Sequence, residues 1–199
     1  MKRYRHLALF LVAFWIYNDG ISTVIKMATA YGNEINISRD TMIKALVITQ
    51  FVGIPCAMIF GSLASKIGSK KAIYLGLFAY VLITIFGYFL RTDTHFYILA
   101  FSVGLVQGGT QALSRSLFAS MVPKSKATEF FGFFSTGSKV AGLFGPALFG
   151  FVTLQAGSSR PAILSIAFFF IVGGFLLRFV NEDEGRRVAR ETDAEAGGA

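Results

Sequence analysis

Polar and ionisable side chains interrupt four of the six long apolar stretches of this chain, near the middle of each stretch. Such groups are costly in hydrocarbon and persist mainly where they face a water-filled cavity or a partner group. The pattern predicts an aqueous path along one side of a helix bundle, and hence a solute transporter or half of one. The candidates for lining this path are Asn18, Asp19, Lys26, Gln50, Gln107, Gln111 and Lys139.

Helical geometry places the ionisable candidates at defined depths. At about 1.5 Å per residue, Asp19 lies about 18 Å from an entry near Leu7, and Lys139 about 15 Å from an entry near Glu129. We therefore expect Asp19 and Lys139 to pair at the midplane, because opposite charges reduce each other's burial cost. The pair either drives a conformational change or only holds helices together. Lys26 lies two turns beyond Asp19 on the same face, near the outer surface.

One stripe of polar residues is expected on the fourth apolar stretch. Gln107, Gln111 and Arg115 recur at every fourth residue, so a helix places them on one face. Gln107 is at mid-depth, whereas Arg115 is close to the cytoplasmic end. Arg115 is expected either to extend its charge to the cytoplasmic surface or to pair with Glu129 there.

Composition excludes several function classes. Only 15% of residues are charged, against about 25% in an average soluble domain. The net charge of +8 is dispersed between apolar runs, which favours a role in membrane topology over nucleic-acid binding. Cys56 is the only cysteine, so no intramolecular disulfide and no cysteine-based metal site is expected. No motif indicates a cofactor, a nucleotide site or a metal site.

The predicted fold is all-α, a polytopic membrane bundle of six transmembrane helices. Lys and Arg cluster before the first span and in alternate connections, whereas the other connections hold Arg39, Arg91 and Arg160. The positive-inside rule then places both termini in the cytoplasm. Residues 1–180 form the six-helix domain, and 181–199 are predicted to be a disordered cytoplasmic tail. The predicted spans are 7–30, 41–64, 72–90, 96–118, 129–155 and 161–180.

Glycines cluster in the fourth and fifth spans. Gly104 and Gly108 form a G-x-x-x-G pair, which permits close helix approach. Gly145-Pro146 is expected to bend the fifth helix, because proline removes a backbone donor. Such a bend either assists a rocking motion or only sets the packing.

The connection after the second span carries a first resemblance. Residues 61–71 read Gly-Ser-Leu-Ala-Ser-Lys-Ile-Gly-Ser-Lys-Lys. They resemble the G-x-L-A-D-R-x-G-R-R/K loop of the major facilitator superfamily, with Ser65 in place of the family's Asp. Residues 106–109 resemble an R-x-x-Q-G stretch of the fourth helix, with Gly104 in place of the Arg. With Arg115 and Glu129, Lys66 and Lys70 are expected to form a cytoplasmic gate.

Three further runs carry a closer resemblance. The first is Tyr-Asn-Asp-Gly at 17–20, followed by Ile-Lys-Met-Ala at 25–28 and Tyr-Gly at 31–32. The second is Gln-Gly-Gly-Thr-Gln-Ala-Leu-Ser-Arg-Ser at 107–116, and the third is Glu-Phe-Phe-Gly at 129–132. Together they resemble the vacuolar-effluxer-like (autophagy-linked amino-acid effluxer) family of that superfamily, over nearly all of residues 7–180.

The resemblance implies the C-terminal six helices of a twelve-helix fold. The first, second, fourth and fifth spans would line the cavity, and the third and sixth would face lipid. The expected partners are the lipid bilayer, a small solute, and an N-terminal six-helix half from the same gene or a separate chain, or else a homodimer. Transport would proceed by alternating access in the plasma (inner) membrane. Amino acids are the implied solutes, and Asp19 is the candidate for proton coupling because burial disfavours its charged form.

Two other functions are compatible with an apolar helix bundle. The chain could be a non-transporting membrane scaffold or a truncated remnant of a permease, although mid-depth charges argue against a scaffold. It could also be an intramembrane enzyme. The latter is disfavoured because His6 and His95 lie at membrane edges and neither Gly-x-Ser-x-Gly nor His-Glu-x-x-His occurs.

Overall fold

A computed structural model describes residues 3–197, and every regular element in that range is a helix. The predicted all-α fold is therefore confirmed. Six stretches of the described chain are long and apolar enough to cross a membrane, and each overlaps one predicted span. The helices are α1 (Arg5–Glu34), α2 (Arg39–Ile67), α3 (Ser69–Tyr88), α4 (Asp93–Met121), α5 (Ala127–Ala141), α6 (Phe144–Ala156), α7 (Ser159–Arg178) and α8 (Glu182–Gly197), with a 3₁₀ turn, η1, at Lys124–Lys126.

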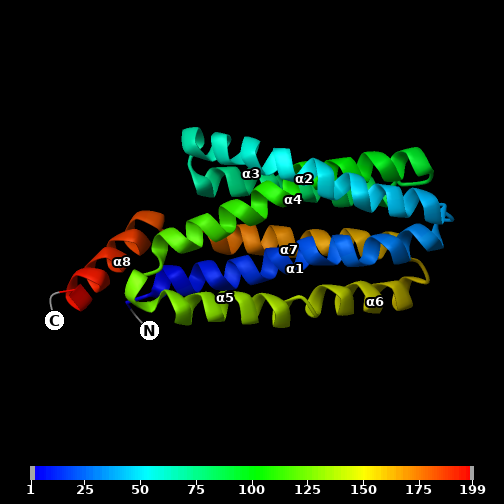
Figure 1. The fold of residues 1–199 in the computed structure, drawn as a ribbon. Coiled ribbons are helices and arrows are strands. Elements are labelled where there is room, and N and C mark those ends of the chain that lie inside the picture. The colour runs from blue at the N-terminus through cyan, green and yellow to red at the C-terminus, as the bar shows by residue number, and fades with distance from the viewer. Residues whose placement is uncertain (1–2, 198–199) are drawn as a thin grey trace.

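The spanning helices lie side by side as an elongated bundle (Figure 1). Helix α2 packs chiefly on α4, α1 packs on α7, and α3 contacts both α4 and α7. Helices α5 and α6 follow one another along α1, and α6 also contacts α7. The two ends of the chain lie at the same end of the bundle, where α8 projects beyond the spanning helices.

The close contact between α2 and α4 depends on glycine. A Cβ atom added at Gly104 would lie 2.9 Å from the Thr49 carbonyl oxygen, and one at Gly108 would lie 3.2 Å from the Gly53 carbonyl carbon. Backbones approach this closely only where no side chain intervenes. The structure thus confirms that the G-x-x-x-G pair permits close helix packing.

Two surfaces of the bundle remain apolar and exposed. In the most apolar windows of α2 and of Lys124–Ala156, 11% and 17% of residues are buried, against 50% in α1 and α4. Phe51, Ile54 and Met58 of α2 are each at least 70% exposed, as is Leu154 of α6 at 84%. Faces of this kind need hydrocarbon or another protein surface around them.

The fifth span is broken rather than bent. Helix α5 ends at Ala141 and α6 begins at Phe144, so the break falls at Gly142 and Leu143, just before the predicted Gly145-Pro146. Pro146 is the third residue of α6. Its ring would clash with the carbonyl of Gly142 in a continuous helix, and it has no N–H to donate.

The end of the chain differs from the disordered tail expected at 181–199, because 182–197 form α8. The Asp193 carboxylate accepts hydrogen bonds from the backbone N–H groups of Lys124 and Ser125, both at 3.0 Å. These bonds hold the pKa of Asp193 below its usual value. At the other chain end, the Arg3 guanidinium pairs with Glu195 at 2.7 Å. Ion pairs one turn apart within α8 add to its helicity; residues 198–199 lie outside the described range.

Candidate functional site

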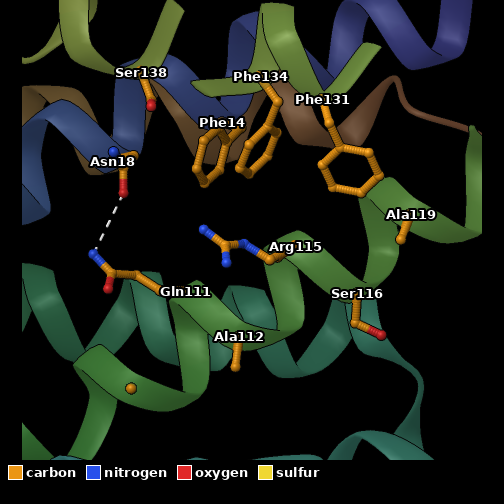
Figure 2. A pocket seen from close by; sticks show the side chains of 11 residues that line it. Phe14, Asn18, Gln111, Ala112, Arg115, Ser116, Ala119, Phe131, Phe134 and Ser138 are labelled. Carbon is orange, nitrogen blue, oxygen red and sulfur yellow. Dashed lines mark hydrogen bonds between the residues drawn. The ribbon is translucent and has the colours of Figure 1, made fainter. Parts of the chain in front are cut away.

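A cavity of about 770 Å³ opens between α1, α4 and α5. Its volume is in the range of sites that take a small molecule, about 300–1,000 Å³. Figure 2 shows its side chains converging from the three helices. The lining residues are Phe14, Asn18, Gly108, Gln111, Ala112, Arg115, Ser116, Ala119, Phe131, Phe134 and Ser138.

The polar side of the cavity is formed by three residues that the sequence singled out. The Gln111 side-chain N–H donates to the Asn18 amide oxygen at 3.5 Å, a long bond that joins α4 to α1. Arg115 lies one turn from Gln111, and its guanidinium extends into the cavity (Figure 2). None of the ion pairs within residues 3–197 includes Arg115. Its charge is therefore not neutralised by a carboxylate of the described chain and is available to an anionic group.

The opposite wall is aromatic. The rings of Phe14 and Phe134 stack with centroids 4.3 Å apart, and Phe118 stacks on Phe134 at 4.7 Å. Phe131 meets Phe118 edge to face. This packed cluster fixes α5 against α1 and α4, and it leaves the cavity with one apolar and one polar face.

Sequence reasoning did not select the aromatic wall or Ser138. The available signal was periodicity: Phe14 precedes Asn18 by four residues, and Phe134 precedes Ser138 by four. Each pair therefore shares a helix face. Apolar residues are common throughout a membrane helix, so Phe14 and Phe134 differ from the others only in sharing a face with a polar residue.

A buried hydrogen bond behind the cavity also joins α1 to α4. The Tyr17 hydroxyl, fully buried, lies 2.6 Å from Ser114 Oγ. Because the Ser114 hydroxyl donates to the Thr110 carbonyl at 2.7 Å, Tyr17 is the donor of this bond. The bond fixes the rotation of α1, and so directs Asn18, the next residue, toward α4.

Asp19 and Lys26 point away from the cavity, toward the break in the fifth span. Asp19 is 2% exposed, and its Oδ2 accepts a hydrogen bond from the Gly145 backbone N–H at 2.7 Å. The Lys26 ammonium donates to the Gly142 carbonyl at 3.0 Å. Both side chains of α1 thus meet backbone groups without helical partners: the Gly145 N–H is freed by the break, and the Gly142 carbonyl has no donor because Pro146 lacks an N–H.

The expected pairing of Asp19 with Lys139 is not found among the ion pairs of the described residues. Lys139 is exposed on the last turn of α5. The reason is the break itself, because the free Gly145 N–H supplies the donor that Asp19 was expected to find in Lys139.

The two remaining path candidates lie outside the cavity. Gln50 is exposed on α2. Gln107 is half-buried on α4, and its side-chain oxygen is buried without a hydrogen-bond partner in the described part of the chain. Their place on a solute path stays a prediction.

The four residues expected to form a cytoplasmic gate are not joined by ion pairs in the described chain. Lys66 and Glu129 are exposed. The Lys70 ammonium instead donates to the carbonyls of Arg178, at 3.1 Å, and Val180, at 2.6 Å. It thereby satisfies the carbonyl end of α7, a favourable place for a positive charge. The gate, including Arg115, stays a prediction.

Within residues 3–197, no group of three or more His, Cys, Asp or Glu side chains is placed to hold a metal ion. The donors of the cavity are the amides of Asn18 and Gln111, the guanidinium of Arg115 and the hydroxyls of Ser116 and Ser138. Such a set suits hydrogen bonding to an organic solute, above all to a carboxylate.

A family model and individual relatives place this chain among the same proteins. Residues 1–190 match the family described as "Vacuole effluxer Atg22 like". The chain is 39% identical over 191 residues to YxiO of Bacillus subtilis (strain 168), named an uncharacterized MFS-type transporter, covering 96% of this chain and 45% of that protein. It is 26% identical over 212 residues to autophagy-related protein 22-1 of Neosartorya fischeri, covering 97% and 35%. It therefore spans less than half the length of these relatives.

Proposed function

Because this chain belongs to the vacuole effluxer Atg22-like family of MFS-type proteins, we propose that it forms one half of a secondary transporter for a small zwitterionic solute, an amino acid. The observation that carries the proposal is the cavity of about 770 Å³ with the free Arg115 guanidinium. The cavity's amides and its aromatic wall complete a site with a charged, a polar and an apolar part. Family membership also favours a transporter over a scaffold or an intramembrane enzyme.

Recognition of the solute depends chiefly on its carboxylate. Arg115 presents a planar set of donors that can grip a carboxylate by two parallel hydrogen bonds. Asn18 and Gln111 lie beside it, and their long mutual bond is weak enough to be exchanged for bonds to the solute. Phe14 and Phe134 provide an apolar surface for the solute side chain.

A second six-helix half completes the transporter in this proposal. The relatives are more than twice as long as the matched segment, and α2 and α5–α6 expose apolar faces. Such a half, from the same gene, a separate chain or a second copy, would close the cavity. Alternating access then follows from rocking of the two halves about the site, with both termini of this chain in the cytoplasm and the bundle in the plasma membrane.

Asp19 carries the coupling proton in this proposal. Its support is burial: Asp19 is 2% exposed, and its Oδ1 has no hydrogen-bond partner in the described chain. A proton on Oδ1 would remove a costly buried charge. We expect Asp19→Asn to abolish accumulation driven by a pH gradient while retaining solute exchange at equal pH. Retention of pH-driven accumulation would remove Asp19 from the coupling step.

The test is solute uptake into vesicles prepared from the membrane in which the protein is naturally expressed. Loss of hydrogen bonds to a charged group costs about 1.5–3 kcal/mol. We therefore expect Arg115→Gln to raise the concentration of labelled amino acid that gives half-maximal uptake by about 10- to 150-fold. Arg115→Lys retains the charge but not the planar pair of donors, and we expect it to show an intermediate loss of affinity for the solute.

The control is Arg91→Gln, an equivalent change at an exposed arginine outside the cavity lining. Amines that match the amino acids but lack the carboxylate test the recognised group. Equal affinities for wild type and Arg115→Gln, or equal transport of those amines, would refute the proposed site. A wild-type protein that inserts but moves no solute would favour the scaffold.

A further inference from the structure

The break in the fifth span leaves backbone groups without helical partners, among them the Gly145 N–H and the Gly142 carbonyl, which faces the missing N–H of Pro146. In an unbroken helix the Gly145 N–H would donate to the Ala141 carbonyl, but Pro146 prevents the chain from continuing in that form. Helix α5 instead ends with a hydrogen bond between residues three apart, from Leu143 N–H to the Val140 carbonyl, at 3.3 Å. Free N–H groups therefore gather at the start of α6, and free carbonyls at the end of α5.

Two side chains of α1 satisfy these two helix ends with the matching charge. The Asp19 carboxylate accepts from Gly145 N–H at the start of α6, where the helix dipole is positive. The Lys26 ammonium donates to the Gly142 carbonyl at the end of α5, where the dipole is negative. Asp19 and Lys26 are seven residues apart on α1 and so lie on one face, two turns from each other.

The fit of α1 at the break requires a glycine at 145. A Cβ atom added there would lie 2.9 Å from Asp19 Oδ1 and 3.0 Å from the Thr23 Cβ. Neither neighbour has room to withdraw, because Asp19 is 2% exposed and Thr23 is fully buried. The contact between Asp19 and the start of α6 is thus a tight backbone contact, not a loose surface bond.

The break also separates two half-helices with different surroundings. Helix α6 packs against both α1 and α7, whereas α5 packs against α1 and η1 and meets α4 through the rings of Phe131 and Phe134. Helix α5 carries Phe131, Phe134 and Ser138, which line the cavity. Any change at the break therefore moves a wall of the cavity relative to an anchored half-helix.

We propose that Asp19 and Lys26 are positioning residues, which clamp the two half-helices and so set the place of α5 at the cavity. The effect of this clamp on solute binding rests on the function proposed above, but the clamp itself does not. Asp19 is the stronger member, because it is buried and a lost bond there leaves a backbone N–H without a partner. Lys26 is exposed, so water can replace its bond in part.

The experiment measures the distance between one position on α5 and one on α6. Spin labels are placed at Phe133→Cys on α5 and Phe151→Cys on α6, which are 64% and 61% exposed. Cys56→Ala removes the only native thiol. The protein, with any further half it carries in its own membrane, is transferred to lipid nanodiscs. Pulsed electron paramagnetic resonance then gives the distribution of label distances.

We expect a narrow distribution in the labelled parent, a broadened or displaced one in Asp19→Ala, and a smaller change in Lys26→Met. Ser22→Ala is the control, since Ser22 lies on α1 between the two clamp positions and takes part in neither inter-helix bond. Gly145→Ala perturbs the same contact from α6 and replaces Asp19→Ala if that variant does not insert.

Parent-like distributions in Asp19→Ala, Lys26→Met and Gly145→Ala would overturn the clamp, as would an equal change in Ser22→Ala. The measurement needs no solute, so a failure of the transport proposal leaves its result unaffected. Conversely, a clamp that is confirmed while Arg115→Gln transports normally would locate the error in the proposed solute site.

Discussion

Substitution of Gly108 by alanine tests the close contact between α2 and α4. The added Cβ would approach the Gly53 carbonyl oxygen within contact distance, and it would lie 3.2 Å from the Gly53 carbonyl carbon and 3.3 Å from the Ala57 Cβ. The first two atoms belong to the α2 backbone, which cannot rotate away as a side chain does. The helix must therefore shift as a unit.

The expected cost follows from the chemistry of overpacking. Forcing an extra carbon into a closely packed interface costs about 1–3 kcal/mol. If the bundle relaxes by releasing α2 from α4, the population of the separated form rises by about 5- to 150-fold. Helix α2 packs chiefly on α4, so few other contacts oppose this release.

Cys56 provides a native reporter of that release. It is the only cysteine of the chain, it is 7% exposed on α2, and it adjoins Ala57 at the interface. Alkylation by a maleimide in intact membranes proceeds through the separated form. When opening is fast relative to alkylation, the rate follows the population of that form. We therefore expect Gly108→Ala to accelerate alkylation by about 5- to 150-fold.

The control adds the same methyl group elsewhere on α2. An added Cβ at Gly61 would find nothing within 4 Å, so Gly61→Ala is expected to leave the alkylation rate unchanged or lower it slightly. An alanine inside a helix is favoured over glycine by about 0.5–1 kcal/mol. A wild-type rate in Gly108→Ala would refute the backbone contact between α2 and α4.

Two further predictions concern the ends and the interior of the bundle. Because backbone N–H groups of Lys124 and Ser125 lower the pKa of Asp193, its stabilising effect on α8 is present above its unfolded pKa, about 3.9, and is lost as the pH falls through its folded value. A spin label at Ala196 should therefore become more mobile in acid. The Asp193→Asn variant should show this higher mobility at neutral pH. Equal label mobility in the variant and in the unsubstituted protein at neutral pH would contradict the contact. Tyr17→Phe and Ser114→Ala should each lower stability by about 1 kcal/mol in denaturant titrations, with the double variant falling short of their sum. Strict additivity would show that the bond contributes nothing.

The number of spans and the cavity's polar residues were predictable from the sequence for local reasons. An apolar run of about 20 residues has few alternatives to a membrane helix. Gln111 and Arg115 share a face because they are four residues apart, and Asn18 lies at a matching depth on another helix. Burial cost therefore predicted that Asn18 and Gln111 would line a common polar path, and both line the cavity; Arg115, which was expected at the cytoplasmic gate, lines it as well.

The partners of the charged side chains could not be predicted in this way. Sequence reasoning paired Asp19 with Lys139 by depth and charge, but the free Gly145 N–H exists only because the fifth span breaks where it does. Likewise, Lys70 was expected at a gate, and it satisfies carbonyls at the end of α7. Backbone N–H and C=O groups are the same in nearly every residue, so the sequence does not show which of them are left without a partner in the fold.

The sequence by itself determined the apolar helices and their approximate ends, because hydrophobic burial and helical periodicity act over neighbouring residues. Only the tertiary structure decided that α8 folds back onto η1 and that Asp19 meets the start of α6. These features depend on hydrogen bonds between residues about 70 to 130 positions apart, and such bonds form only after the helices have packed.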